Sequence, residues 1–357
     1  MAETPRVLFV ADLNSYAKGR ARMRALERLG LKIKPVTHTA IGGNDKGYPD
    51  LSISFRLAWK IGIHIDTEKV NRILPIEAKT FTPDLVWIEK GNMIKPATIK
   101  RMKAASPNAV IVSYSEDDMF NELNRTRAFT AGLAHYDIVF TTKSHNTNPD
   151  ELKALGARRC IMVDKAFDPD QHYPVDITHD ELNAYGSDIG FIGSYARERG
   201  EDVMMLAKNG FQVRVWGNGW NSFMETHPNL KVERRALVNT DGDLLYSKAI
   251  AATRINLGFL RKANRDLQTD RSIEIPACGG FMLAEYSTEH ARLFENGLEA
   301  VFYRNRDEMM KKARYFLEHE SERQTIAAAS RERCVNSGYT HDERLRFMLS
   351  QALGKPF

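Results

Sequence analysis

The sequence contains few cysteines, and they do not occur in pairs. Its 357 residues include only Cys160, Cys278 and Cys334, with no CxxC spacing. An odd number of cysteines without paired spacing argues against a disulfide framework and against a structural zinc site, and it is typical of a reducing compartment. We therefore expect a cytoplasmic protein without a disulfide.

Long apolar runs are also missing. No stretch approaches the roughly 20 consecutive apolar residues that cross a bilayer. The N-terminal residues MAETPRVLFVADLN have no basic segment before their short apolar run, so they do not predict a signal peptide. These absences predict a soluble chain.

A large excess of charge of one sign is also missing. The 51 Lys and Arg residues nearly balance the 46 Asp and Glu residues, which gives a formal net charge of +5 without a long basic block. Nucleic-acid partners are therefore disfavoured, whereas small anionic substrates are compatible with the composition. The C-terminal helical stretch is rich in Lys and Arg, so peripheral contact with an anionic membrane is an alternative. Its mixed charges favour a solvated face.

Short β-branched apolar runs alternate with amphipathic stretches along the first half of the chain. The predicted strands are 6–10, 32–36, 84–88, 109–114, 137–141 and 160–163. The predicted helices between them are 19–29, 67–80, 96–105 and 119–133. Continuous apolar strands separated by helices are typical of a parallel sheet covered on both faces. Residues 39–65 depart from this alternation and predict an insertion at one edge.

The alternation pauses in a segment rich in Pro, Asp and His, and then resumes. The later strands are predicted at 188–192, 212–216, 254–258, 281–284 and 299–302. The later helices are predicted at 198–208, 241–251, 272–277, 306–317, 320–336 and 340–353. We therefore expect an α/β protein with two doubly wound, Rossmann-like domains, which are residues 1–168 and 188–339, joined by a linker at 169–187. Open parallel sheets bind ligands at the carboxyl ends of their strands.

A strand, a glycine and a basic helix start follow one another in DIGFIGSYARERGEDVMMLAK, residues 188–208. Gly193 lets a ligand approach the backbone, and the helix start offers unpaired N–H groups to an anion. Arg197 and Arg199 add forked donors for phosphate oxygens. The alternative is that both arginines are solvated first-turn residues. Walker and GxGxxG fingerprints are absent.

The segment DRSIEIPACGGFMLAEY, residues 270–286, allows three interpretations: a structural turn, a cysteine nucleophile, or a helix end that holds a ligand. Gly279 and Gly280 predict the end of a short helix before a strand. Pro276 is expected near the start of that helix, where a missing N–H is harmless. Cys278 has no histidine nearby in sequence, which favours packing over nucleophilic catalysis.

Glu274 lies in this short apolar helix, where a buried carboxylate is costly without donors. The vicinal hydroxyls of a ribose would supply such donors. Arg271, one turn earlier, is either the partner of Glu274 or a second phosphate contact.

These stretches resemble a known family. RSIEIPACGGFMLAE and the helical sequence behind it are similar to the C-terminal domain of the glycosyltransferase family that includes the spore-maturation protein CgeB. PDLVWIEKG, YSEDDMF, YDIVFTTKSHN, ELKALGARR and AFDPDQHYP resemble its N-terminal domain. The resemblance covers nearly the whole chain and implies a GT-B fold. Two Rossmann-like domains would face a cleft, with the nucleotide-sugar donor on the second and the acceptor on the first. The final helix, 340–357, would cross back to the first domain.

A more distant similarity is to the Glu-x7-Glu motif of retaining family-four glycosyltransferases. Glu274 matches the second glutamate, which in that family binds the donor ribose. Asp266 stands eight positions earlier, where the motif has a glutamate close to the transferred sugar. Arg199 falls at the position of the family's lysine, whereas Ser194 replaces its arginine, a change for which Arg197 would compensate.

The resemblance thus implies a nucleotide-sugar glycosyltransferase that acts on a glycan, a lipid-linked molecule or a protein. Arginines and a helix start would neutralise the leaving diphosphate without a metal or other cofactor. The Asp-x-Asp of TDGD (Asp241, Asp243) is interpreted as a helix N-cap.

Several polar residues beyond first-half strands are candidate acceptor or base residues. They are Asp12, Glu89, Asp117, Asp118 and His145. The sequence favours Asp117 or Asp118 as the residue that touches the acceptor, although the acidic run also fits a helix N-cap with a first turn rich in carboxylates. Two alternatives to transfer remain: a nucleotide-sugar 2-epimerase and a non-catalytic nucleotide-sugar-binding protein.

Overall fold

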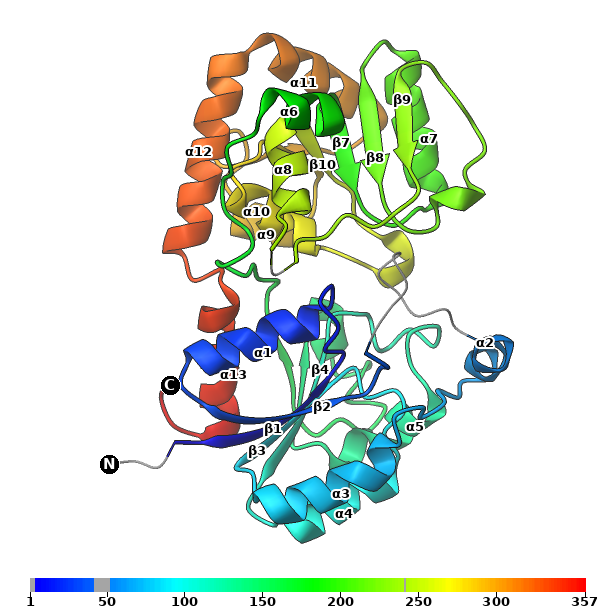
Figure 1. Cartoon of the computed structure of the whole chain (residues 1–357), viewed down its shortest axis with the longest axis vertical. Coiled ribbons are helices and arrows are strands. Elements are labelled where there is room, and N and C mark those ends of the chain that lie inside the picture. Colours follow the sequence, from blue (N-terminus) through cyan, green and yellow to red (C-terminus); the bar gives the residue numbers. More distant parts are fainter. Residues whose placement is uncertain (1–3, 42–51, 241) are drawn as a thin grey trace. The chain divides into compact units, whose positions relative to one another are not determined.

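In the computed structural model, which describes residues 4–41, 52–240 and 242–357, the chain divides into two compact units. The first unit contains residues 1–164 and 341–357, and the second contains residues 165–340. Each is built on one six-stranded sheet with helices packed against it (Figure 1). Among the described residues, no helix is long and apolar enough to cross a membrane.

The first sheet is entirely parallel, with the order β2-β1-β3-β4-β5-β6. Its strands are Arg6–Ala11 (β1), Lys32–Thr37 (β2), Leu85–Glu89 (β3), Val110–Ser115 (β4), Ile138–Thr141 (β5) and Cys160–Met162 (β6). Its helices are Lys18–Arg28 (α1), Ile53–Lys60 (α2), Val70–Phe81 (α3), Pro96–Ala105 (α4), Arg127–Gly132 (α5) and His341–Leu353 (α13).

Strand β1 explains why this sheet is covered on both faces. Val7 and Phe9 belong to one hydrophobic cluster, whereas Leu8 and Val10 belong to another. Because successive strand side chains point to opposite faces, an uninterrupted apolar strand requires a core on each side. The first core includes residues of α1 and α13, and the second includes residues of α3 and α4.

Helix α13 closes the chain by packing on the first unit, as the fold prediction expected. Leu345, Met348 and Leu349 are buried in its core. The Arg28 guanidinium of α1 pairs with Asp342, with Nη2 2.6 Å from Oδ2. The C-terminal stretch is therefore an integral part of a core and not a free basic face.

We expect Leu345→Ala to lower the free energy of unfolding of the first unit by about 2–5 kcal/mol, because it leaves a cavity between α13 and the sheet. Urea denaturation followed by fluorescence measures the change. Phe347→Ala is the matched control on the same helix: its side chain is 45% exposed, and we expect a loss of under about 1 kcal/mol. Equal losses in both variants would contradict this packing.

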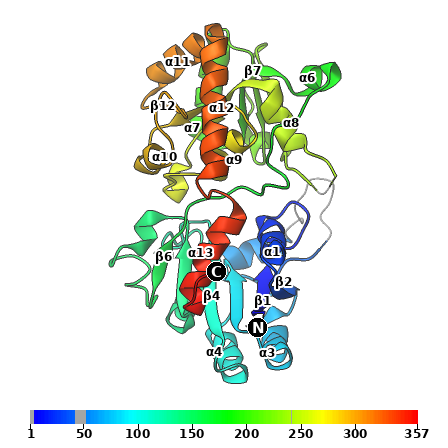
Figure 2. The ribbon, with the colours of Figure 1, turned by 90° about the vertical axis from the view of Figure 1, so that its left-hand side faces the viewer.

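The second sheet is also entirely parallel, with the order β12-β11-β10-β7-β8-β9. Its strands are Ser187–Ile192 (β7), Val213–Trp216 (β8), Leu230–Glu233 (β9), Thr253–Gly258 (β10), Met282–Glu285 (β11) and Val301–Tyr303 (β12). Its helices are His179–Tyr185 (α6), Arg197–Lys208 (α7), Leu245–Ala252 (α8), Asp270–Ala277 (α9), Thr288–Leu293 (α10), Arg306–Glu318 (α11) and Glu320–Asn336 (α12). In Figure 2, α12 runs beside α9.

Numbered within its own unit, this order is the Rossmann order 6-5-4-1-2-3. The chain direction across the sheet reverses between β7 and β10, which pair through Ile255 and Ile189. Ligands of such sheets bind outside the carboxyl ends of the strands at this reversal. The expected class, two doubly wound parallel α/β units, is confirmed.

Several predicted elements differ from the structure. The predicted helix 119–133 is reduced to α5, because the side chains of Asp118 and Asn121 accept N–H groups two residues on and hold residues 118–123 in turns. The segment predicted as a linker carries α6, which begins with a capping box of Thr178 and Glu181. Strand β9 was not predicted. Residues 42–51 of the expected insertion lie outside the described residues.

Candidate functional site

The catalytic and donor-site residues predicted around the reversal between β7 and β10 lie in four segments. Gly193 follows β7, Arg197 and Arg199 begin α7, and Asp266 lies in the connection after β10. Arg271 and Glu274 lie on α9, which follows the same connection. The strand order therefore brings residues 193–199 and 266–274 to the same edge of the sheet.

Arg199 is a buried cation with unused donors. Its side chain is 3% exposed, and its Nη1 donates to the backbone oxygen of Ser194 at 2.8 Å. Nε and Nη2 are buried, and neither has a hydrogen-bond partner among the described residues. Burial and the charge of Arg271 together lower the pKa of Arg199 to about 10, and the charge of Asp266 opposes both effects. The group is still cationic at neutral pH, and no carboxylate of the described residues forms an ion pair with it.

Arg271 lies close to Arg199, and both guanidinium groups lie over the ring of Phe191. The distances from their Cζ atoms to the ring centroid are 5.3 Å for Arg199 and 5.9 Å for Arg271. The Nε atom of Arg271 is also buried without a hydrogen-bond partner in the described part of the chain. Cation–π contact makes it less costly to hold two like charges together, but it leaves their donors available to an anion.

The start of α7 adds positive potential to this place. Its N-cap residue, Ala196, makes no side-chain cap, so the first N–H groups of the helix are not covered by a side chain. Arg197 points elsewhere: its side chain is 88% exposed and pairs with Glu201 at 3.1 Å. Packing also explains why residue 193 is a glycine, because a Cβ atom there would lie 2.5 Å from the Phe191 ring.

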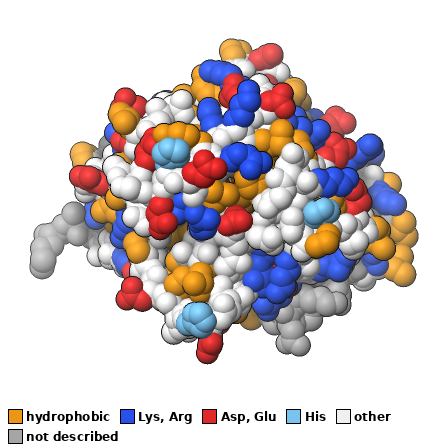
Figure 3. Space-filling view, turned by 90° about the horizontal axis from the view of Figure 1, so that it is seen from above, with side chains coloured by type: hydrophobic (Ala, Val, Ile, Leu, Met, Phe, Trp, Pro, Cys, Tyr) orange, Lys and Arg blue, Asp and Glu red, His pale blue; other side chains and the backbone are white. Residues whose placement is uncertain are grey.

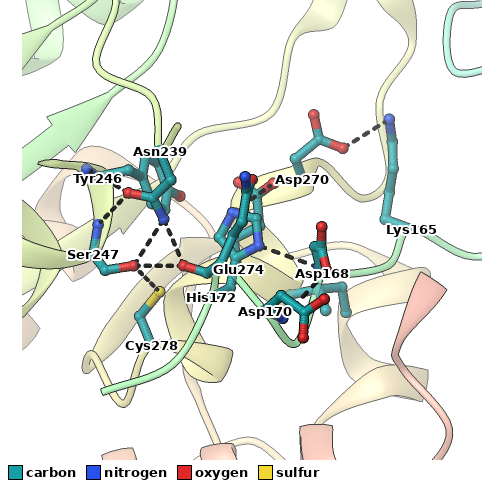
Figure 4. A network of polar contacts seen from close by, with 12 residues as sticks. Lys165, Asp168, Asp170, His172, Asn239, Tyr246, Ser247, Asp270, Glu274 and Cys278 are labelled. Atoms are coloured by element: carbon teal, nitrogen blue, oxygen red, sulfur yellow. Dashed lines mark hydrogen bonds and ion pairs between the residues drawn. The ribbon is translucent and has the colours of Figure 1, made fainter. Parts of the chain in front are cut away.

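Glu274 is buried on α9 and faces His172. The residue is 3% exposed, and its Oε1 lies 3.6 Å from Nε2 of His172 (Figure 4). His172 Nδ1 accepts the backbone N–H of Asp168 at 3.2 Å, so the ring proton is on Nε2 and points to the carboxylate. The buried histidine therefore stabilises a buried carboxylate at the site.

The end of α9 explains the two glycines. The N–H groups of Gly279 and Gly280 donate to the backbone oxygens of Pro276 and Ile275, and Gly279 has a φ of +76°. This pair of bonds is a Schellman ending, which favours glycine in the left-handed conformation. Pro276 lies in the last turn of α9 and not at its start, which corrects the prediction. Cys278 is buried, with Sγ 3.4 Å from Oγ of Ser247, as packing predicts.

A buried histidine attaches α9 to the neighbouring strand. His290 Nδ1 donates to the backbone oxygen of Glu285 at 2.7 Å, and Nε2 accepts from Oγ of Ser272 at 2.6 Å. Ser272 Oγ in turn accepts the N–H of Thr269 at 2.9 Å. Burial lowers the pKa of His290 to about 4. His290 was not among the predicted residues. Its only sequence signal is its position three residues after Ser287, which caps α10.

This burial predicts a pH-dependent stability. Unfolded His290 takes up a proton near its ordinary pKa of 6.5, whereas in the folded protein it does so only near 4. The unfolded state therefore binds more protons in this window, and the free energy of unfolding falls by about 3 kcal/mol as the pH falls through it. Urea denaturation of His290→Gln should show a flatter pH dependence, whereas His179→Gln, an exposed control, should match the wild type. Identical pH profiles for all three would contradict the role of His290.

Asp266 lies in the connection between β10 and α9. Its Oδ1 accepts from the amide of Asn264 at 2.8 Å, and its N–H donates to the backbone oxygen of Arg261. It is partly exposed, and its charge raises the pKa of Arg199. A carboxylate is thus present near the arginines.

The TDGD segment is not an N-cap. Helix α8 begins at Leu245, and Oδ1 of Asn239 accepts the N–H groups of Tyr246 and Ser247 at 2.9 and 3.2 Å. Asp243 forms a bridge with Thr240, and Asp241 lies outside the described residues. Figure 4 shows Asn239 beside Ser247 and Cys278, so this cap also joins the Glu274 region.

The two acidic candidates of the first unit have different environments. Asp118 is fully buried, and its Oδ1 accepts from Nδ2 of Asn146 at 2.7 Å, which ties two loops together. The Asp117 side chain is 29% exposed, and its Oδ2 lies 2.6 Å from Nζ of Lys90. Of the two, Asp117 is the one that a substrate can reach.

The other candidates lie at or after the carboxyl ends of three strands: Asp12 after β1, Glu89 at the end of β3 and His145 after β5. Glu89 is 7% exposed and accepts both Nε and Nη2 of Arg22, whose Nη1 also pairs with Glu116 at 3.0 Å. Both carboxylate oxygens of Glu89 are therefore already engaged by Arg22. His145 lies in a short 3-10 helix, Ser144–Thr147.

His38, which the sequence analysis missed, follows β2 at the same edge of this sheet. Burial lowers the pKa of His38, whereas the charge of Asp12 opposes the shift. Its position directly after a strand was the signal that could have found it.

Residues 200–350 match a family model described as "Glycosyl transferase-like". That match includes Arg271 and Glu274 and runs from α7 into α13. A comparison with curated proteins finds no significant match.

Solved structures with a similar fold cover nearly the whole chain. The sucrose-phosphate synthase of Thermosynechococcus elongatus has a TM-score of 0.64, 12% identity and 99% coverage of both chains. An alpha-glucosyltransferase in complex with UDP and a 13-mer DNA has a TM-score of 0.65 and 12% identity over 99% of this chain and 100% of that chain. HepE from Anabaena, in complex with UDP and glucose, has a TM-score of 0.59 and 12% identity over 97% of this chain and 100% of that chain. The two six-stranded units thus have the GT-B architecture.

Proposed function

We propose that this protein is a metal-independent glycosyltransferase of the retaining type that transfers a sugar from a nucleotide-diphosphate sugar to a glycan, lipid-linked or protein acceptor. The observation that carries the proposal is Arg199, a buried cation with two unused nitrogen donors beside the open start of α7. The family match of residues 200–350 to a glycosyl transferase-like model supports the same assignment.

The chemistry of the leaving group explains the need for these cations. When the glycosidic bond to the donor phosphate breaks, negative charge develops on the diphosphate, and preorganised donors lower the barrier. Arg199, Arg271 and the N–H groups of α7 supply positive charge at one place without reorganisation. The carboxylate of Asp266 would lie close to the transferred sugar.

The roles of the carboxylates follow from their burial. Glu274, oriented by His172, would accept the ribose hydroxyls, because a buried carboxylate gains most from two fixed donors. Asp117, exposed beside Lys90, would contact the acceptor hydroxyl in the first unit. Gly279 and Gly280 act by ending α9 and thereby set the position of Glu274.

Arginine substitutions test the diphosphate site. Two of the similar structures contain UDP, so UDP is the first probe, followed by GDP, dTDP and CDP. We expect Arg199→Ala and Arg271→Ala each to weaken binding about 10- to 100-fold, because each removes charge-assisted hydrogen bonds. Calorimetry measures the affinity. Arg197→Ala is the control, since this arginine is exposed and pairs with Glu201. A wild type that binds none of the four nucleotides would refute the donor site.

Carboxylate substitutions separate binding from catalysis. We expect Glu274→Gln to weaken nucleotide binding about tenfold, because an amide is a weaker acceptor for ribose hydroxyls. Asp266→Asn should leave the affinity for the free nucleoside diphosphate within about twofold and lower sugar transfer or donor hydrolysis at least tenfold. Radiolabelled donor turnover measures the second effect. If Asp266→Asn turns over donor at the wild-type rate, Asp266 has no role near the sugar.

A further inference from the structure

Helix α2, Ile53–Lys60, is an unusual element of the first unit because none of its residues is buried. It lies at the periphery of that unit, away from the strands (Figure 1). Ile53, Leu57 and Ile61 are 71%, 58% and 59% exposed. Their spacing of four residues places them on one face. The residues after the helix continue the apolar surface, since Ile63 is 46% exposed.

The opposite side of α2 has its own packing, which directs this apolar face outward. The rings of Phe55 and Trp59 contact His64 edge-on, with centroid distances of 4.8 and 5.5 Å. The side chain of Ser52 caps the first turn by accepting the N–H of Phe55 at 3.1 Å. The helix is therefore locally stabilised while its largest aliphatic side chains stay in water, an arrangement that favours an external apolar partner.

The charges on this segment all have one sign. Arg56 and Lys60 are exposed, and residues 52–65 contain no acidic residue. Arg127, whose backbone N–H donates to the oxygen of Gly62, adds a third exposed cation beside the end of α2. The next acid, Asp66, accepts the N–H groups of Val70 and Asn71 at the start of α3.

We propose that α2 docks the protein on an anionic lipid surface, with Ile53, Leu57 and Ile61 in the headgroup–acyl boundary and Arg56 and Lys60 on lipid phosphates. An exposed apolar face flanked by cations on one short helix is a feature of interfacial helices. A second copy of the chain would place the cations of two helices against each other. A helix of two turns also offers far less than the roughly 800 Å² per partner of a stable protein interface.

The docking does not depend on the proposed activity, so its test uses lipid alone. The intact chain is sedimented with vesicles of phosphatidylcholine, with and without phosphatidylglycerol. We expect binding only to the anionic vesicles, with weakening as salt increases. Ile53→Ser/Leu57→Ser/Ile61→Ser and Arg56→Glu/Lys60→Glu should each lower the partition coefficient roughly tenfold or more.

Matched controls lie on the second unit. Leu298→Ser removes a leucine with 59% exposure, nearly that of Leu57, and Arg235→Glu/Lys311→Glu reverses two exposed cations. Both should bind vesicles like the wild type, and urea unfolding curves should show that every variant folds.

Three outcomes would overturn the proposal. They are no vesicle binding by the wild type, equal binding by the α2 variants and the controls, and a concentration-dependent dimer in sedimentation velocity that the triple serine variant abolishes. The third would assign the face to a second copy of the chain.

Discussion

The candidate site of the second unit depends on two like charges, Arg199 and Arg271, which the fold holds close together. Arg199 and Arg271 both lie over the ring of Phe191, and the burial of Arg199 removes water that would otherwise screen their repulsion. Repulsion between two like charges is unfavourable, and an anion that reached both groups would offset it. The free-energy cost of holding the two cations together would be offset when an anion binds, and this preorganisation would favour the binding of a diphosphate.

The rest of the unit keeps these charges in place. Strand β7 supplies the Phe191 ring, and the backbone oxygen of Ser194 fixes one end of Arg199. Helix α9 carries Arg271, and the hydrogen-bonded chain from Thr269 through Ser272 to His290 anchors that helix to the strand behind it. The neutral form of His290 matters here, because a charged imidazole would add another buried cation to a unit that already holds Arg199.

On the face shown in Figure 3, Lys and Arg side chains are interspersed with Asp and Glu. An extended single-sign stripe of the kind that binds nucleic acid is not present on that face.

Much of the fold followed from the sequence because uninterrupted apolar runs such as Val7–Ala11 have only one stable environment, the middle of a covered parallel sheet. Predictions failed where side chains bond to distant or local backbone. Asn239 caps α8 from outside the helix, and Asp118 turns the chain where a helix was expected. Arg197 and Arg199 were both predicted to bind phosphate, because the sequence alone does not show which of two arginines in the first turn of a helix points inward. His172 and His290 had no pattern at all, since their roles depend on contacts made across the fold.

The charged groups at the carboxyl edges of the two sheets differ in how they are paired, and this difference bears on what each unit binds. At the carboxyl edge of the first sheet, Arg22 is satisfied by Glu89 and Glu116, and Lys90 is paired with Asp117. Paired charges present fixed donors and acceptors with little net field, which suits a neutral, hydroxyl-rich molecule. At the corresponding edge of the second sheet, buried guanidinium donors are left without partners among the described residues, which suits an anion. An acceptor sugar and a nucleotide diphosphate differ in this same way, so the difference in charge between the units supports the proposal that the donor binds to the second unit.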